Sequence, residues 1–257
     1  TKDIGELKRI FLSPGPIFDP EDRMHDYWGY TEAFYSVGFR PGDVVQVTFN
    51  YHLSPAGLMF EEPLRNLGCA SIPAGPTDPG TQLDIMQKLR VSGYVGTASY
   101  LMHLAQKAEE KGINLRKDLF QEVAFVTGER LSEKMRNQLE KKFDIILRQG
   151  YGTADVGCIG YECFHKTGLH ISNRCYVEIC HPDTGIPLKD GEVGEIVVTS
   201  FNKTYPLIRL ATGDLSYIDR APCACGRTSP RLGSIVGRVD TTARIKGMFV
   251  YPHQVEQ

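Results

Sequence analysis

The sequence predicts an α/β fold: a mainly parallel sheet with flanking helices, followed by a small β-roll or barrel. Short apolar strands and amphipathic helices alternate over the first half of the chain. From Gly168 onward the helical periodicity is lost, and short strands and turns follow one another. The length of 257 residues suits one large domain or two smaller ones with a buried core.

The composition is that of a folded globular chain. Apolar residues make up 41% and charged residues 23%, close to the globular average, which excludes a disordered tail or a fibrous repeat. The 29 basic and 31 acidic residues leave a net charge of −2. No overall field therefore predicts binding to nucleic acid or to an acidic membrane surface.

The lack of a recognisable membrane span or signal peptide, together with the cysteine usage, favours a cytoplasmic location. No stretch approaches the roughly 18 apolar residues that a membrane span needs, and the first residues lack the apolar core of a signal peptide. The seven cysteines are an odd number for a chain of this length. They predict reduced thiols or metal ligands before a disulfide framework.

The first β-α step begins with a strand at 43–49, which is rich in β-branched residues. The segment after it, 57–67, carries apolar residues at near-helical spacing. A second strand is predicted at 69–72. Thr81, with Asp84 three residues later, has the pattern of a helix N-cap.

The alternation continues through the middle of the chain. A short strand at 93–96 precedes a helix over 99–112 with one apolar face. A strand at 122–126 precedes a helix that starts at Ser132, and a further strand begins at 145–147. In sheets of this kind, ligands bind in the crevice beyond the carboxyl ends of the strands.

Five loops follow directly on predicted strands and share a composition of Gly, Thr and aromatic residues. They are 50–52, 74–76, 96–98, 128–130 and 151–155. Glycine lets backbone amides approach a ligand closely, and a Thr hydroxyl can contact phosphate or a metal-bound water. The loops therefore indicate nucleotide chemistry. For any one loop, the alternative is that Gly and Thr only turn the chain.

The second half predicts a β-roll. Strands are predicted at 176–180 and 194–199, with a turn at 183–185 between them. The predicted organisation is an α/β core at 1–167, a β-roll subdomain at 168–236 and a further segment at 237–257.

Short motifs stand in a fixed order along the second half. They occupy 151–155 (Tyr-Gly-Thr-Ala-Asp), 191–195, 205–214 (ending Thr-Gly-Asp), 223–228 (Cys-Ala-Cys-Gly-Arg-Thr), 237–240 (Gly-Arg-Val-Asp) and 252–256 (Pro-His-Gln-Val-Glu). Each motif is weak alone. In this order and spacing they resemble the adenylate-forming enzymes, most closely the phenylacetate-CoA ligase group, from about residue 43 to the last residue.

The resemblance implies an activity with its cofactors and partners. Members activate a carboxylic acid with ATP to an acyl-adenylate and then pass the acyl group to the thiol of coenzyme A, which releases AMP; Mg²⁺ is the metal. The implied partners of this chain are the acid, ATP and coenzyme A. Nucleic acid and membrane are excluded as partners, and a homodimer is left open.

The resemblance assigns a nucleotide site. Its residues are Gly128, Glu129, Tyr151, Gly152, Thr153, Asp214 and Arg238. The adenine lies in a slot formed by the backbone of the Gly-Glu pair and stacks on the tyrosine. The aspartate accepts from the ribose hydroxyls, and the arginine is a second contact. For Asp214 the alternative is an aspartate that caps a turn after Gly213.

The catalytic residues implied by the resemblance are Thr153 and Asp155, which would ligate Mg²⁺ and contact phosphate. The family has Glu where this chain has Asp155, so the reach is one methylene shorter. Asp240 matches the hinge about which the small C-terminal domain of the family rotates. The resemblance thus implies an adenylation core at 1–167, and a hinge with the start of a truncated C-terminal lid domain at 237–257.

An apolar pocket for an aryl or other apolar acid is also implied. Its residues are Tyr51, His52, Gly96, Thr97 and Ala154. For His52, a core histidine with satisfied hydrogen bonds is an equal alternative.

Cysteine and histidine residues in two segments predict a structural zinc site. Cys223 and Cys225 frame a tight turn, and Cys163 and His170 lie upstream. Three thiolates and one imidazole make a closed tetrahedral site. His165 is the rival fourth ligand, and the alternative is that these are reduced, buried cysteines without a metal.

The chain departs from the family at the phosphate loop. In residues 11–18, Ser13 and Gly15 match, but the paired Thr and the Lys are absent, and two prolines remove N–H donors. Much of the family's N-terminal region and its C-terminal lysine domain are also absent. We expect the chain as printed not to complete the reaction, as a fragment or as a variant with altered chemistry.

Three hypotheses follow. The first is an acyl-CoA ligase of the phenylacetate-CoA ligase type. The second is a non-catalytic, zinc-stabilised homologue that binds adenylate. The third is an adenylating enzyme that delivers its acyl group to an acceptor other than coenzyme A.

Overall fold

The structure is a computed structural model that describes residues 2–13, 17–241, 243–245 and 248–250. The chain divides into two compact units, Thr1–Cys158 and Ile159–Gln257. The organisation into 1–167, 168–236 and 237–257 stays a prediction. The Pro-His-Gln-Val-Glu motif and Gly15 of the phosphate-loop segment lie outside the described residues.

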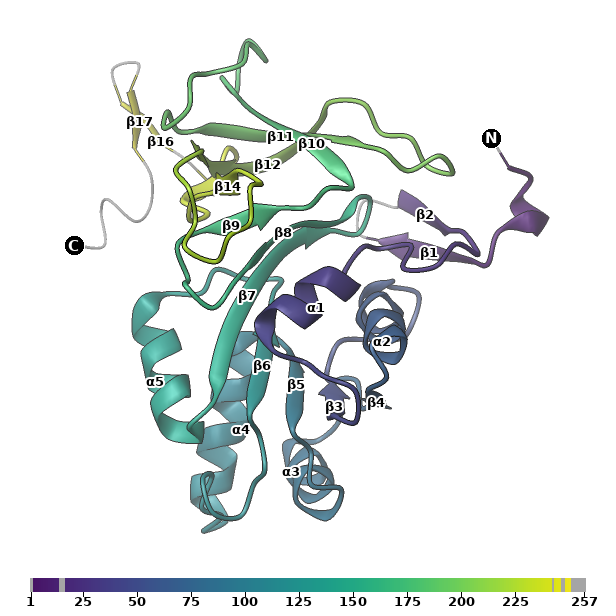
Figure 1. Cartoon of the computed structure of the whole chain (residues 1–257), viewed down its shortest axis with the longest axis vertical. Coiled ribbons are helices and arrows are strands. Elements are labelled where there is room, and N and C mark those ends of the chain that lie inside the picture. Colours follow the sequence, from purple (N-terminus) through teal and green to yellow (C-terminus); the bar gives the residue numbers. More distant parts are fainter. Residues whose placement is uncertain (1, 14–16, 242, 246–247, 251–257) are drawn as a thin grey trace. The chain divides into compact units, whose positions relative to one another are not determined.

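The first unit alternates strands with helices (Figure 1). Its strands are β1 (Arg9–Ser13), β2 (Ile17–Glu21), β3 (Val44–Val47), β4 (Ala70–Pro73), β5 (Gly93–Gly96), β6 (Val123–Val126) and β7 (Ile146–Thr153). Its helices are η1 (Ile4–Glu6, a 3-10 turn), α1 (Thr31–Val37), α2 (Ala56–Asn66), α3 (Pro79–Lys88), α4 (Ala98–Glu110) and α5 (Glu133–Phe143). Over the described residues, no helix is both long and apolar enough to cross a membrane.

A parallel sheet forms the centre of this unit. Its strands lie in the order β4, β3, β5, β6, β7, and each neighbouring pair is parallel. Sequential strands can pair in parallel only if the chain between them returns to the other end of the sheet. Helices make these crossover connections here, and they lie on the faces of the sheet. The predicted α/β fold with a mainly parallel sheet is confirmed.

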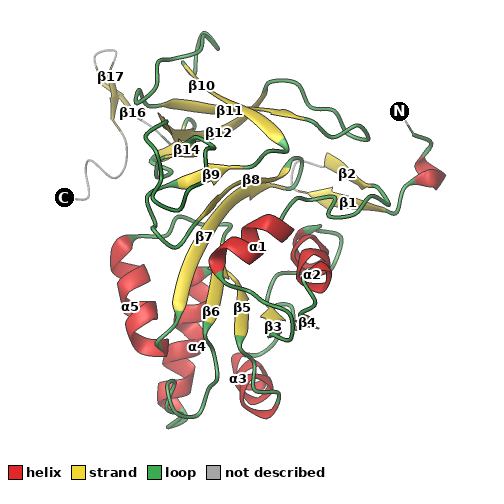
Figure 2. Ribbon diagram, viewed as in Figure 1, coloured by secondary structure: helices red, strands yellow, loops and turns green. Residues whose placement is uncertain are grey.

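Alternate side chains of the strands pack on two apolar layers. On one face, Ala124 and Val126 of β6 belong to a core cluster with residues of α3, α4 and α5. On the other face, Phe125 packs edge-on against Phe34 of α1, with ring centroids 5.0 Å apart, and lies near Phe60 of α2. The helices are drawn in red against the yellow strands in Figure 2. Because side chains alternate along a strand, burial on both faces requires the continuous apolar runs seen in the sequence.

The helix start predicted at Thr81 is wrong by one turn. Asp78 is the N-cap of α3, and its carboxylate accepts from the backbone N–H of Thr81 at 3.0 Å. Pro79 occupies the first helical position, where its missing N–H is not needed. Thr81 therefore lies inside the first turn and donates to the cap.

The start predicted for α5 is confirmed. Ser132 is the N-cap, and its hydroxyl oxygen accepts from the N–H of Met135 at 3.2 Å. Asp144, at φ 62°, ends the helix in the left-handed region.

Ser132→Ala is expected to lower the free energy of unfolding by about 1 kcal/mol, because the N–H of Met135 loses its acceptor. Urea denaturation measures the change. Ser132→Asp supplies an equivalent acceptor and is expected to keep the stability of the parent. A Ser132→Ala variant as stable as the parent would contradict the capping contact.

Strand β7 is longer than the sequence predicts. It runs from Ile146 to Thr153, so Tyr151, Gly152 and Thr153 are strand residues rather than loop residues. The sequence does not predict this length because the strand contains polar residues such as Arg148. Arg148 can be buried in β7 because its guanidinium donates to Glu140 of α5 at 3.1 Å.

The second unit consists of short strands in the part of the chain that the structure describes. They are β8 (Gly157–Glu162, which begins at the unit boundary), β9 (Leu169–Ile171), β10 (Cys175–Cys180), β11 (Gly194–Ser200), β12 (Leu210–Ser216), β13 (Ile218–Asp219), β14 (Arg231–Leu232), β15 (Gly237–Arg238), β16 (Ala243–Ile245) and β17 (Met248–Val250). Strands β10, β11, β12 and β15 form an antiparallel sheet, and β13, β14, β9 and β8 pair antiparallel in that order. The predicted change to strands and turns is confirmed.

Candidate functional site

The carboxyl ends of β3 and β5 are locked together by hydroxyl groups. Thr48, just after β3, donates to the Tyr94 hydroxyl at 3.2 Å, and Tyr94 donates to the carbonyl oxygen of Thr97 at 3.0 Å. Burial raises the pKa of Tyr94, which keeps its hydroxyl a donor. A Cβ on Gly96 would overlap both hydroxyl oxygens. Gly96 is therefore needed for packing at this edge.

The loop after β5 caps α4. Thr97 is the N-cap, and its Oγ1 accepts from the N–H of Tyr100 at 3.2 Å. The carboxylate of Glu129, in the loop after β6, accepts from the N–H of Ser99 at 2.5 Å and from its Oγ at 2.8 Å. The sequence predicted a backbone role for Glu129 and gave no sign of this side-chain contact, which joins two different loops.

Tyr51 and His52, which are predicted to line the acid pocket, lie between β3 and α2 in different environments. Tyr51 is half-buried with its ring against Gly57, where a Cβ would come within 2.6 Å of a ring carbon. Burial and nearby Glu61 raise the pKa of Tyr51. His52 is exposed, and its Nδ1 lies 3.2 Å from Oδ1 of Asn50. The alternative that His52 is a core histidine is therefore wrong.

The Tyr-Gly-Thr motif ends β7 in a tightly packed turn. Gly152 has no room for a side chain, because a Cβ would overlap the carbonyl oxygen of Gly157 and the hydroxyl of Tyr30. Thr153 Oγ1 accepts from the N–H of Val156 at 3.1 Å, which fixes the turn that carries Ala154 and Asp155. The motif residues Tyr151 to Asp155 therefore lie together at the carboxyl end of β7.

Strand β2 carries a buried carboxyl group that the sequence does not predict. Asp19 is fully buried, and neither of its oxygens has a hydrogen-bond partner among the described residues. Burial raises the pKa of Asp19; nearby Ser13 opposes the rise and the charge of Asp155 adds to it. An uncompensated buried carboxyl is unfavourable for stability, and no sequence pattern predicted one here.

The hairpin of β1 and β2 carries a cluster of charges. Glu21 is fully buried and accepts from Arg9 through both oxygens, at 3.0 and 3.1 Å, with Lys8 at 3.0 Å. Lys8 also pairs with Glu62 of α2. These ion pairs fix the hairpin whose strands include the described residues of the predicted phosphate-loop segment, 11–13 and 17–18.

Asp214 and Arg238 pair within the second unit. They face each other in the register of β12 and β15, with Nη1 of Arg238 3.0 Å from Oδ1 of Asp214. The Nε of Arg238 donates to Asp240 at 3.1 Å. Asp214 is thus an ion-paired strand residue rather than the turn cap that was the alternative. A Cβ on Gly213 would lie 2.7 Å from Arg238 Nη2, so glycine makes the close approach possible.

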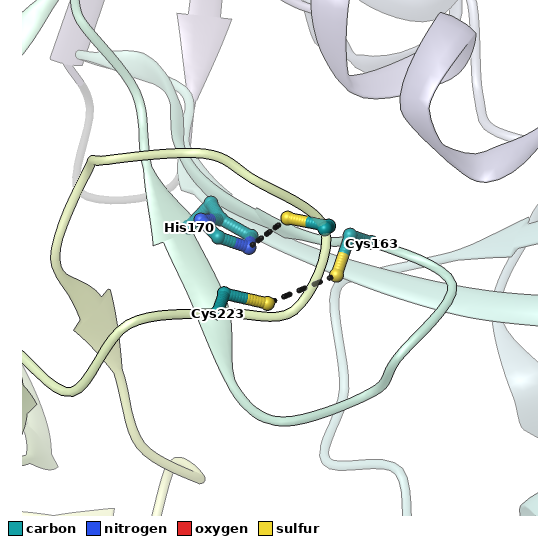
Figure 3. A group of neighbouring side chains, drawn as sticks. Cys163, His170 and Cys223 are labelled. Atoms are coloured by element: carbon teal, nitrogen blue, oxygen red, sulfur yellow. Dashed lines mark hydrogen bonds between the residues drawn. The ribbon is translucent and has the colours of Figure 1, made fainter.

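The four predicted metal ligands come together in the second unit. The ligand atoms of Cys163, His170, Cys223 and Cys225 all lie within 4.8 Å of one another. Figure 3 shows the side chains of Cys163, His170 and Cys223 directed toward one another. The rival ligand His165 is not in the cluster; it is exposed, with its ring against Phe164 at 4.3 Å.

Two distances in this cluster are close to those between ligands of a tetrahedral zinc site. Zn–S bonds of about 2.3 Å and Zn–N bonds of about 2.0 Å place two sulfurs about 3.8 Å apart and sulfur and nitrogen about 3.5 Å apart. Cys163 Sγ is 3.7 Å from Cys223 Sγ, and Cys225 Sγ is 3.4 Å from His170 Nε2. His170 Nδ1 lies 3.1 Å from Ser229 Oγ, an outer contact that orients the ring.

The thiols of the cluster differ in acidity. Burial raises the pKa of Cys163 to about 11. For Cys223, burial acts in the same direction, but hydrogen bonds from the Cys225 backbone, Thr167, Cys225 and Cys163 outweigh it and lower the pKa to about 7. Cys223 therefore presents a thiolate to a metal more readily than Cys163 does.

Comparison with known proteins identifies the family. The model of the family described as "AMP-binding enzyme" matches residues 24–203. The chain belongs to this family, and its predicted resemblance to the phenylacetate-CoA ligase group is confirmed. It is 32% identical to a phenylacetate-coenzyme A ligase of Thermus thermophilus over 226 residues, which are 86% of this chain and 51% of that protein. A phenylacetate-coenzyme A ligase of Escherichia coli is 30% identical over 233 residues, with the same coverage.

Solved structures share the fold. An open conformation of 2-hydroxyisobutyryl-CoA ligase, in complex with 2-HIB-AMP and CoA, superposes with a TM-score of 0.91 at 24% identity, over 99% of this chain and 63% of that chain. ATP-bound MatB from Rhodopseudomonas palustris has a TM-score of 0.72 at 19% identity, over 99% of this chain and 52% of its own. The chain spans about half the length of the curated relatives it matches.

Proposed function

We propose that this chain forms the AMP-binding part of a ligase that uses ATP to convert an aryl or other apolar carboxylic acid to an acyl-adenylate and then to a coenzyme A thioester. The observation that carries the proposal is the similarity to phenylacetate-coenzyme A ligases over most of the chain. The acid pocket would be lined by Tyr51, His52, Gly96, Thr97 and Ala154.

In this proposal the adenine contacts the backbone of Gly128 and Glu129 and stacks on Tyr151. The ribose hydroxyls donate to Asp214. The ion pair with Arg238 supports this role, because it holds the carboxylate in one orientation on β12. Asp240, the second carboxylate partner of Arg238, is proposed as the hinge.

Oxygen ligands suited to Mg²⁺ lie at the end of β7. Thr153 and Asp155 would hold the ion, and the buried Asp19 beside Asp155 supplies a further carboxyl without a hydrogen-bond partner among the described residues, which fits a site for a cation. Bound Mg²⁺ neutralises charge on phosphate oxygens. The residues of the turn would orient the phosphate against the acid.

The cluster of Cys163, His170, Cys223 and Cys225 is proposed as a structural Zn²⁺ site. The ligand set is complete at four, so no position stays open for a substrate. All seven cysteines are thiols in the structure, which supports the cytoplasmic location proposed from the sequence.

Asp214→Ala is expected to weaken AMP binding about 10- to 100-fold, because the ribose loses hydrogen bonds to a charged acceptor. Calorimetric titration with AMP measures the affinity. The matched control is Asp190→Ala, which also removes one partner of an ion pair in the second unit, with Arg220 at 2.6 Å, and is expected to leave the affinity unchanged.

An Asp214→Ala variant that binds AMP as well as the parent would remove Asp214 from the proposed site. Pyrophosphate exchange on the full-length protein, with ATP and phenylacetate, separates the ligase from a non-catalytic adenylate-binding homologue. A ligase exchanges label between pyrophosphate and ATP; a binding module does not.

A further inference from the structure

Glu129 joins two loops that the proposed function gives to different substrates. It lies in the loop after β6, whose backbone is assigned to the adenine, and its carboxylate binds Ser99 at the start of α4. The loop before α4 holds Gly96 and Thr97, which are assigned to the acid pocket. The carboxylate sits at the positive end of the helix dipole and accepts an N–H that has no partner within the helix.

The backbones of the two loops are also adjacent. Strands β5 and β6 pair in parallel with Gly96 opposite Val126, and the N–H of Thr127 continues the ladder to the carbonyl oxygen of Gly96 at 3.2 Å. Beyond this bond Gly128, at φ 83°, turns the chain. Glu129 then reconnects them through its side chain.

The acid-pocket side of this connection has a rigid base. The carbonyl oxygen of Thr97 accepts from Tyr94, which is fully buried. Thr97 Oγ1 lies 3.2 Å from Ser99 Oγ, the hydroxyl that contacts Glu129. Tyr94 thus fixes Thr97, and Thr97 in turn holds the hydroxyl of Ser99. In contrast, Gly128 and Glu129 are exposed. Glu129 therefore anchors an exposed loop to a fixed point at the start of α4.

We propose that Glu129 is a positioning residue, which through Ser99 holds the adenine loop against the start of α4 and so couples the binding of the nucleotide to the order of the acid-pocket loop. The inference rests on the proposed function. Glu129 acts through its side chain on Ser99, and its backbone stays directed to the nucleotide.

Amide hydrogen exchange on the ligand-free chain tests the connection. Glu129→Ala, which removes both hydrogen bonds to Ser99, is expected to speed exchange in 97–101 and 127–130 by at least about fivefold, the effect of losing one hydrogen bond. Ser99→Ala removes only the bond from the Ser99 hydroxyl and is expected to have a smaller effect. Because both variants act on the same contact, the double variant is expected to exchange no faster than Glu129→Ala alone. Glu122→Ala, the same change at the opposite end of β6, is the control and is expected to leave both segments unchanged.

AMP tests the coupling. In the parent, AMP is expected to slow exchange in both segments. In Glu129→Ala, AMP is expected to slow exchange only in 127–130. Unchanged exchange of 97–101 in ligand-free Glu129→Ala overturns the inference and leaves the proposed function intact. If AMP slows amide exchange only in 127–130 of the parent, the inference is likewise overturned and the proposed function stays intact. A parent that does not bind AMP overturns the proposed function, and the coupling with it.

Discussion

Gly152→Ala is expected to lower the free energy of unfolding by about 3 kcal/mol, the upper end of the usual cost of overpacking. The added methyl group would overlap the carbonyl oxygen of Gly157 and the hydroxyl of Tyr30. The first of these is backbone and cannot rotate away. Gly157 itself is fixed at φ 83° and packs against the carbonyl of Trp28. Urea denaturation followed by far-ultraviolet circular dichroism measures the loss.

Two further variants make this result specific. Gly5→Ala adds the same methyl group where no heavy atom lies within 4 Å, and is expected to change stability by less than about 0.5 kcal/mol. Adding Tyr30→Phe to Gly152→Ala removes one of the two overlaps and is expected to recover part of the stability. If Gly152→Ala is as stable as Gly5→Ala, the end of β7 is not packed as described.

Cys223→Ser is expected to abolish zinc binding and to lower the free energy of unfolding by at least about 3 kcal/mol, because the binding free energy of a structural metal is also folding free energy. The parent, purified without added zinc, is expected to contain close to one equivalent by metal analysis. A chelator is expected to lower the melting temperature of the parent and to leave that of Cys223→Ser unchanged.

Cys69→Ser is the matched control for the zinc site. Cys69 is also a buried thiol, but it lies in the first unit, where it donates to the carbonyl oxygen of Arg40 at 3.3 Å. This variant is expected to keep the full zinc content. A metal-free parent whose stability does not respond to zinc or chelator would disprove the site and leave a cluster of reduced cysteines.

The sequence predicted the parallel core because its signals are local. The strand at 93–96 is entirely apolar or glycine, and Ser132 stands at the point where an N-cap is needed. The start of α3 was misplaced although the signal was present: Asp78 followed by Pro79 is a typical helix start. The end of β7 was missed because burial of Arg148 depends on Glu140, a partner from another element.

The candidate sites differ in how far the sequence could predict them. The sequence predicted Cys163, His170, Cys223 and Cys225 as metal ligands with His165 as a rival, and the fold brings His170, not His165, to the three cysteines. The buried Asp19 and the contact of Glu129 with Ser99 were beyond the sequence. Both depend on side chains meeting across separate elements, which no local pattern encodes.

The spacing of the proposed zinc ligands has a consequence for how the second unit would fold. Cys163 and Cys223 are 60 residues apart, and β9 to β13 lie between them. An ion bound by both would close a large ring in the denatured chain and so reduce its conformational entropy, as a disulfide would. Strand pairings that are distant in sequence form slowly. If the proposed site binds zinc, metal supply during synthesis would affect the yield of folded protein.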